Sequence, residues 1–185
     1  MCQHVVIGSR CGQMRFNVAQ LLREPVGSTR KYYLEEDIQD LGEEVKLTHP
    51  IEGAIRLIHT TEGVLVSGQL HTEVELTCSR CLESFSIAVD FTLEEEFRPT
   101  IDISTGAKLP SIDGEDEATL IDGQHIIDLR EVLRQDILLA LPTRPLCKLE
   151  CAGLCSQCGQ NLNEGSCTCE QPLADPRWEA LQALR

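Results

Sequence analysis

The chain has 185 residues and a net charge of −14, with 42% hydrophobic and 25% charged residues. Its length fits one domain, alone or with a small appendage, and its composition excludes a disordered protein. The longest purely apolar run is the five residues from Ile137 to Leu141, whereas a membrane helix needs about 20. The apolar stretch near the start is too short for a secretory signal, so we expect a cytoplasmic protein with no membrane partner.

The negative charge is unevenly distributed. Residues 1–34 carry five basic side chains and one acidic one, whereas residues 35–127 carry five basic and 21 acidic ones. Affinity for nucleic acid comes from Lys and Arg that displace counterions from phosphates. The chain as a whole is therefore not attracted to RNA, and any RNA contact must use a local basic patch or be mediated by another protein.

Residues 1–13 show no periodicity, and we expect a disordered N-terminal extension, translated from an upstream start codon. Its two cysteines, Cys2 and Cys11, are interpreted as free surface thiols. Residues 14–146 are expected to form an α+β domain. Asn17 can cap a short helix over residues 18–23, and residues 31–34 are predicted to form a strand.

Alternating apolar residues dominate the middle of the chain, over residues 51–57, 64–76 and 85–93. Alternation of this length predicts antiparallel strands with one buried face and one solvent-facing face. Gly68 interrupts the second run and predicts a β-bulge. The expected solvent-facing positions include Glu73, Glu75 and Asp90.

Residues 94–122 are acidic and rich in Gly, Pro and Ser, which predicts a long mobile loop. The loop is either a solvating linker or an arm that mimics phosphate and binds a basic partner. A helix over about residues 128–141 follows, with Asp128 as cap and Glu131 completing a capping box. Asp136 lies near its apolar stripe, and we expect it to be structural, bonded to the backbone or to an arginine. The predicted fold is therefore an antiparallel sheet with a capped helix.

Residues 147–185 are expected to form a cysteine-rich zinc-binding segment that ends in a short helix. Asp175 and Pro176 are typical of a helix start, and Trp178 lies on the apolar face of that helix. This face packs on its own domain or serves as an anchor for a partner.

Eight of the ten cysteines form tight groups in the sequence. Zinc takes four ligands in a tetrahedron, and two cysteines separated by two residues can bind one ion through a tight turn. The spacing favours one or two structural Zn²⁺ ions. The alternatives are an exchange of ligands between the groups, such as 78/81/155/158, or a single filled site. The favoured groups are Cys78, Cys81, Cys147 and Cys151, and Cys155, Cys158, Cys167 and Cys169.

Other cysteine chemistry fits less well. A redox dithiol needs a thiolate at a helix N-terminus beside a βαβ pattern, the spacing matches neither common ferredoxin pattern, and disulfides require an oxidising compartment. Catalytic zinc favours His or carboxylate ligands and an open position, and the five histidines are scattered. We therefore expect neither an enzyme nor a small-molecule substrate.

The order of the motifs resembles the YceD family, whose members are called large ribosomal RNA subunit accumulation proteins. The resemblance is carried by Cys-x-Arg-Cys at residues 78–81, Ile-Leu-Leu-Ala-Leu-Pro at 137–142, the cysteine pattern of 147–169 and Asp-Pro-Arg-Trp at 175–178. This chain has Ser156 where the family often has Pro. The resemblance implies a bacterial or organellar cytoplasmic protein that supports accumulation, processing or stability of 23S ribosomal RNA, and it implies no enzyme activity.

Three functions remain open. The first is a non-catalytic, zinc-stabilised ribosome biogenesis factor that contacts a large-subunit RNA precursor or a ribosomal protein. The second is an acidic chaperone for a basic ribosomal protein, and the third is a thiol redox protein or a nuclease. The residues expected to contact RNA or a partner are Arg15, Arg23, Arg30, Lys31, Arg80, Arg144 and Trp178.

Overall fold

The computed structural model describes residues 14–37, 46–110, 114 and 116–169. The expected N-terminal extension with Cys2 and Cys11, and the expected C-terminal helix with Trp178, lie outside these residues. No helix in the described part of the chain is long and apolar enough to cross a membrane. The elements are β1 (Arg15–Asn17), α1 (Ala19–Leu22), β2 (Thr29–Glu36), β3 (Lys46–His59), β4 (Val64–Thr77), β5 (Ser84–Pro99), η1 (Glu117–Thr119), β6 (Leu120–Ile121), β7 (Ile126–Asp128) and α2 (Arg130–Ala140).

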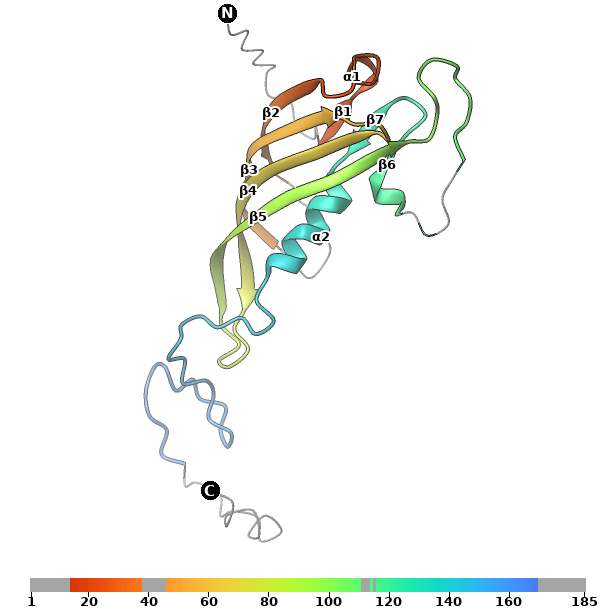
Figure 1. The fold of residues 1–185 in the computed structure, drawn as a ribbon. Coiled ribbons are helices and arrows are strands. Elements are labelled where there is room, and N and C mark those ends of the chain that lie inside the picture. Colours follow the sequence, from red (N-terminus) through yellow and green to blue (C-terminus); the bar gives the residue numbers. More distant parts are fainter. Residues whose placement is uncertain (1–13, 38–45, 111–113, 115, 170–185) are drawn as a thin grey trace, which may run out of the picture.

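The fold is α+β and is built on a five-stranded sheet in the order β2-β3-β4-β5-β6 (Figure 1). The pairings from β2 to β5 are antiparallel, as the alternation predicts. The short edge strand β6 pairs with β5 in parallel, so the sheet is mixed rather than purely antiparallel. The long connection after β5 carries the chain back before β6 begins, so β6 runs in the same direction as β5 when the two strands pair. β1 and β7 form a separate two-stranded antiparallel sheet.

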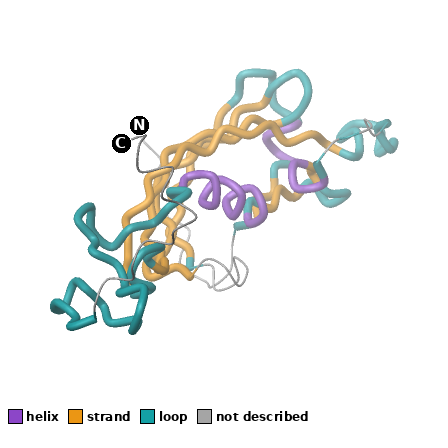
Figure 2. The backbone as a smooth tube through the Cα atoms, turned by 90° about the horizontal axis from the view of Figure 1, so that it is seen from below, coloured by secondary structure: helices purple, strands orange, loops and turns teal. Residues whose placement is uncertain are grey.

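One face of the large sheet forms the core, and α2 lies along that face (Figures 1 and 2). The alternating residues of β3, β4 and β5 point inward, and they meet the apolar stripe of α2. Burial of each such side chain contributes about 1.5–3 kcal/mol relative to exposure. The inward-facing residues include Ile51, Ile55, Leu57, Val64, Val66, Leu70, Val74, Val89, Phe91 and Leu93, and they pack with Val132, Leu133 and Ile137.

Gly68 does not form the predicted bulge. It pairs with Ile55 on one side and Leu93 on the other in uninterrupted register. A Cβ at this position would lie 2.5 Å from the carbonyl oxygen of Ala54, so glycine permits a close approach of two strands. The register shifts of the sheet lie instead in β3, between Leu47 and Glu52.

The predicted mobile loop of 94–122 is wrong at both ends. β5 continues to Pro99, because Phe97 extends the inward alternation and is fully buried. At the other end η1 and β6 occupy residues 117–121. Between them the chain turns at Asp102, whose Oδ1 accepts hydrogen bonds from the backbone of Ser104 and Thr105. The acidic residues 94–96 therefore belong to a strand.

The capping box predicted for α2 is also absent. The residue before the helix is Leu129, which has no side-chain cap. Asp128 ends β7 and accepts a hydrogen bond from the backbone N–H of Arg130 at 3.1 Å. Glu131 instead accepts hydrogen bonds from Arg134, three residues along the helix. Asp128 thus accepts from one of the free N–H groups at the start of the helix, as a cap does, whereas Glu131 bonds to Arg134 and does not complete the predicted box.

Asp136 lacks the partner that its sequence position predicts. Its Oδ2 is buried and has no hydrogen-bond partner in the described part of the chain. Burial, followed by the negative charge of Glu95 on β5, raises the pKa of the Asp136 carboxyl. An ionised carboxylate at this position therefore destabilises the contact between α2 and β5.

Candidate metal centres

The first cluster of cysteines lies at the tip of the β4–β5 hairpin and contains Cys78, Cys81, Cys147 and Cys151. Cys78 and Cys81 lie in the tight turn between β4 and β5, which Leu82 completes with a positive φ of 60°. The segment after α2 brings the other two cysteines to this tip. It is attached there by a 2.9 Å hydrogen bond from the backbone N–H of Ser79 to the carbonyl of Pro145.

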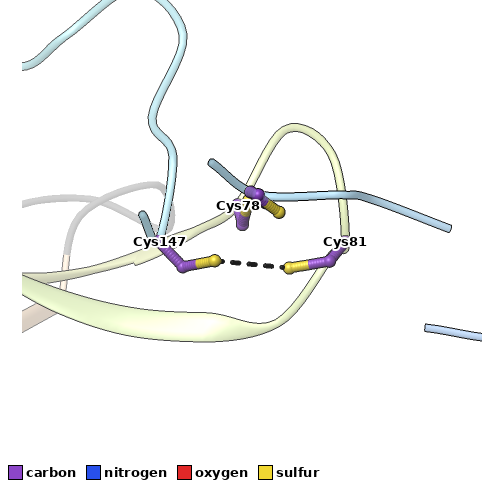
Figure 3. A group of neighbouring side chains, drawn as sticks. Cys78, Cys81 and Cys147 are labelled. Carbon is purple, nitrogen blue, oxygen red and sulfur yellow. Dashed lines mark hydrogen bonds between the residues drawn. The ribbon is translucent and has the colours of Figure 1, made fainter. Parts of the chain in front are cut away.

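The sulfur positions of the first cluster fit a tetrahedral metal ion. The sulfurs of Cys78 and Cys151 are 3.8 Å apart, and those of Cys81 and Cys147 are 3.6 Å apart; Figure 3 shows the second pair. Four sulfurs at about 2.3 Å from a central zinc are separated by about 3.8 Å. A disulfide would require about 2.05 Å, and all four cysteines are free.

The surroundings of the first cluster favour thiolates at two of its sulfurs. The backbone N–H of Cys81, more than any other group, lowers the pKa of Cys78 to about 6. For Cys151 the leading cause is the side chain of Asn163, whose Nδ2 donates to the sulfur at 3.3 Å and lowers its pKa. Burial raises the pKa of Cys147 to about 12. Four sulfurs in contact thus cannot all ionise without a cation between them.

Two side chains beyond the cysteines hold this centre, and the sequence analysis assigned neither this role. Arg80 donates from Nη1 to the carbonyl oxygen of Cys151 at 2.9 Å, which joins the hairpin to the downstream segment. Asn163 lies in the loop between the cysteines of the second cluster, and its bond to Cys151 joins the two centres. The sequence offered one signal for this role, which is the position of Asn163 in the Asn161-Leu162-Asn163 loop, because short polar side chains in such loops bond to nearby backbone and sulfur.

The second cluster contains Cys155, Cys158, Cys167 and Cys169. Gly159 has a φ of +73° and donates its N–H to the carbonyl of Cys155 at 2.9 Å, which closes the turn around the first two sulfurs. The backbone N–H of Cys158 is the leading cause that lowers the pKa of Cys155 to about 6. In contrast, the side chain of Cys158 raises the pKa of Cys169 to about 12.

The two clusters differ in burial. In the first, three of the four cysteines are buried and pack with Phe85, Leu146 and Leu154. In the second, Cys158 and Cys169 are exposed and the other two are half-buried. The first cluster therefore has an apolar shell of its own, whereas the second depends on its own ligands and on the Asn163 contact.

The donor set determines what these clusters can bind. Each cluster offers four sulfurs, with all ligand atoms within 4.8 Å of one another. Soft thiolates in a tetrahedron select zinc or an iron–sulfur centre over hard cations. The structure brings together the two groups of four that the spacing favours, rather than the exchanged grouping.

The basic residues expected to contact a partner do not form one patch. Arg23, Arg30 and Lys31 lie near the start of β2, whereas Arg80 and Arg144 lie at the hairpin tip with the first cluster. The two groups are far apart. Ser67 of β4 lies level with the first group, and the strand from Ser67 to Cys78 at the tip is roughly 35–40 Å long. Arg30 is paired with Glu24, and its contact with RNA or a partner stays a prediction.

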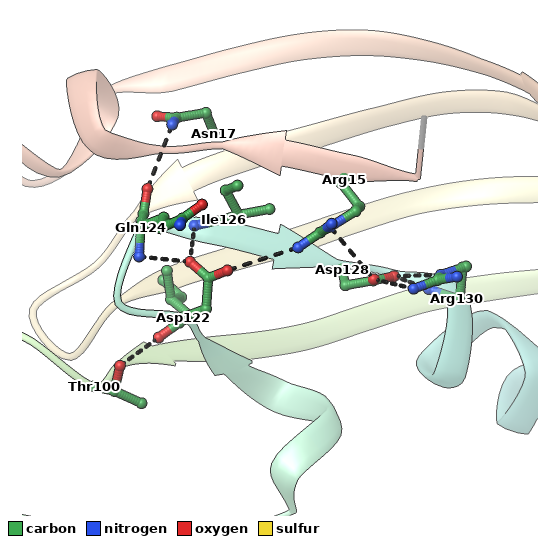
Figure 4. Close-up of polar contacts among 9 residues, drawn as sticks. Arg15, Asn17, Thr100, Asp122, Gln124, Ile126, Asp128 and Arg130 are labelled. Atoms are coloured by element: carbon green, nitrogen blue, oxygen red, sulfur yellow. Dashed lines mark hydrogen bonds and ion pairs between the residues drawn. The ribbon is translucent and has the colours of Figure 1, made fainter. Parts of the chain in front are cut away.

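Arg15 is likewise occupied. Its guanidinium lies 3.7 Å from Asp122 and 3.6 Å from Asp128, and it links β7 to the turn that precedes it (Figure 4). Asp128 also accepts from Arg130 at 2.6 Å. Arg15 thus has ion-pair partners in and beside the small sheet, and its contact with RNA or a partner stays a prediction.

Fold and site together define a mixed-sheet domain that carries, at one end, two four-cysteine clusters that could each hold a metal ion. The sequence profile of the family described as "Large ribosomal RNA subunit accumulation protein YceD" matches residues 66–185. The chain belongs to this family.

Relatives include an uncharacterised protein of Mycobacterium tuberculosis, 32% identical over 128 residues, which covers 69% of this chain and 58% of that protein. The "Large ribosomal RNA subunit accumulation protein YCED homolog 1, chloroplastic" of Arabidopsis thaliana is 28% identical over 156 residues, which covers 74% of this chain and 49% of the relative. The chain thus spans about 58% of the length of its mycobacterial relative. No solved structure matches it.

Proposed function

We propose that the chain is a non-catalytic cytoplasmic factor that supports the accumulation, processing or stability of 23S ribosomal RNA. The observation that carries the proposal is the match of residues 66–185 to a family described by accumulation of the large ribosomal RNA subunit. The Arabidopsis relative bears the same description. The partner is a large-subunit RNA precursor or a ribosomal protein bound to it.

Within this proposal the two clusters hold structural Zn²⁺. Each cluster offers four sulfurs, and a tetrahedral zinc bound by all four would have no open position for water or substrate. When bound, zinc supplies a cross-link between sulfurs far apart in the sequence. Structural sites of this type contribute about 10–16 kcal/mol of apparent binding free energy in peptides. The cysteines therefore hold the downstream segment against the hairpin and carry out no reaction.

The proposal is tested in cells that lack the gene. We expect the ratio of large- to small-subunit ribosomal RNA to fall, and the full-length wild-type gene to restore it. A variant with Cys78→Ser and Cys151→Ser should fail to restore it, because the first cluster is lost. An unchanged RNA ratio in the deleted cells, with normal large-subunit precursors, would contradict the proposal.

A second function, an acidic chaperone for a basic ribosomal protein, is supported by the carboxylates that remain exposed on the sheet. Glu94 and Glu96 are exposed on β5, and Asp90 is exposed on the same strand. A chaperone of this kind should capture basic ribosomal proteins, and a variant with Asp90→Asn, Glu94→Gln and Glu96→Gln should lose that capture. Retention of capture by this variant would remove these carboxylates from consideration.

Enzyme activity is the remaining alternative. We propose that there is none, because the all-thiolate clusters offer no open coordination position. Incubation of the pure protein with RNA, with and without Mg²⁺, should yield no cleavage, and the native protein should not reduce a disulfide substrate. Turnover in either assay would overturn the non-catalytic role.

A further inference from the structure

The outer face of the large sheet carries a cationic pair that the metal centres do not explain. Side chains alternate across the strands, so Lys31 and Tyr33 of β2 point away from the core, as do Ala54 and Arg56 of β3. All four are exposed to solvent. In the part of the chain that the structure describes, no element covers this face.

Lys31 and Arg56 lie directly opposite each other on neighbouring strands. Like charges in this arrangement repel and destabilise a sheet. The next strand places the neutral Ser67 opposite Arg56, and Glu94 follows only on β5, two strand spacings or about 9.5 Å away. Among the described residues, the positively charged pair thus has no carboxylate directly beside it on this face, although the protein has a net charge of −14.

An exposed aromatic ring adjoins this pair. Tyr33 follows Lys31 on the same face of β2 and is 64% exposed. Its cross-strand neighbour is Ala54, whose small side chain does not cover the ring. Tyr32, on the other face, packs against Phe16 with ring centroids 5.0 Å apart. Of these two tyrosines, Tyr33 therefore offers the open ring face beside the two cations.

We propose that Lys31, Arg56 and Tyr33 bind an unpaired nucleotide of single-stranded RNA, with the phosphate between the two cations and the base on the tyrosine. The inference rests on the proposed function in 23S RNA accumulation. Phosphate contacts and stacking on an aromatic ring are the two interactions that single-stranded binding requires. Ser67 and Gln69 lie on the same face of β4 and provide hydrogen-bonding groups beside the base.

The charges around this nucleotide platform limit what it binds. Beyond Tyr33 the next row across the sheet contains Glu35, Glu52, His71 and Asp90. A duplex has closely spaced phosphates along both strands, and these would meet the carboxylates. A short unpaired segment avoids them, so the platform selects single strands over duplexes.

The test uses the full-length, metal-loaded protein and a fluorescently labelled 12-nucleotide oligouridine, with affinity measured by anisotropy over a range of salt concentrations. Tyr33→Ser should weaken binding about 5- to 150-fold through lost stacking. Lys31→Ala with Arg56→Ala should lower the slope of log K against log salt by about 0.7, because the pair neutralises one phosphate of the single strand. The matched control, Lys46→Ala with Lys108→Ala, removes the same charge elsewhere and should leave the slope within about 0.3 of the wild type.

A stability readout separates binding from folding. Because the cationic pair repels itself, the double variant should melt no lower than the wild type in the absence of RNA. A lower melting temperature would make the pair structural and overturn the inference. Absence of oligonucleotide binding by the wild type, or equal losses in the platform and control variants, would overturn it as well.

The platform and the broader function can fail separately. In cells that lack the gene, a Lys31→Ala, Tyr33→Ser, Arg56→Ala variant should restore 23S RNA poorly. Full restoration by this variant would refute the platform and leave the proposed function standing. A normal 23S level without any copy of the gene would refute the proposed function itself.

Discussion

Substitution of one cysteine in the first cluster tests how the metal centres stabilise the fold. Cys151→Ser removes a sulfur that contacts Cys78, 73 residues away in the sequence, and the neighbouring contact from Cys81 to Cys147 spans 66 residues. Closure of a loop of about 70 residues removes about 4 kcal/mol of conformational entropy from the unfolded chain. We therefore expect this variant to lose about 4 kcal/mol of stability, which lowers the melting temperature by about 10 °C.

The matched control is Cys158→Ser in the second cluster. Its sulfurs close a much shorter loop, as the contact between Cys155 and Cys167 spans only 12 residues. The loop lies outside the main core, so its loss exposes little buried surface. We expect the main unfolding transition to stay within about 1 kcal/mol of the wild type, while residues 152–169 become sensitive to protease.

Urea denaturation of the zinc-loaded proteins, followed by far-ultraviolet circular dichroism, measures both effects, because the signal reports mainly the large sheet. Chelation of zinc from the wild type should reproduce the larger loss. Equal stability of Cys151→Ser and the wild type, or an equal loss in Cys158→Ser, would refute the reasoning that the first centre alone cross-links the core.

Three further substitutions test local contacts. Burial and Glu95 raise the pKa of Asp136, so the folded state binds the proton of this carboxyl more tightly than the unfolded state. Asp136→Asn should therefore leave the stability unchanged near pH 3 and raise it by about 1 kcal/mol near pH 7 after solvent screening. A urea titration that shows a loss of stability at pH 7 would contradict this. Gly68→Ala places a Cβ 2.5 Å from the Ala54 carbonyl oxygen and should cost about 2 kcal/mol, whereas unchanged stability would mean that the strands separate freely. Asn163→Leu removes the N–H donor to a sulfur of the first centre and should weaken zinc binding about tenfold in competition with a chelator; unchanged affinity would assign Asn163 to the loop alone.

The sequence was most informative where a pattern repeats or a ligand set is complete. Strict alternation in residues 85–93 predicted an inward face that the structure confirms. The second cysteine cluster is contiguous, and its assignment left Cys147 and Cys151 to complete the first. Both inferences depend on short-range periodicity or on simple counting, which a sequence displays directly.

Long-range register is what the sequence could not show. The repulsive pair of Lys31 and Arg56 exists only because β2 and β3 align at those residues. The basic residues close together in sequence, such as Arg30 and Lys31, lie on opposite faces of one strand and therefore do not act together. The parallel edge strand β6 was hidden for a similar reason, because its two residues show no periodicity.

The most direct measurement is the metal content of the reduced, full-length protein by native mass spectrometry, combined with labelling of free thiols in the same sample. We predict two zinc ions per chain, one for each cluster, with label only on the two cysteines outside the clusters, Cys2 and Cys11. A folded protein that carries no metal and takes label on all ten cysteines would contradict a structure held together by sulfur-bound cations.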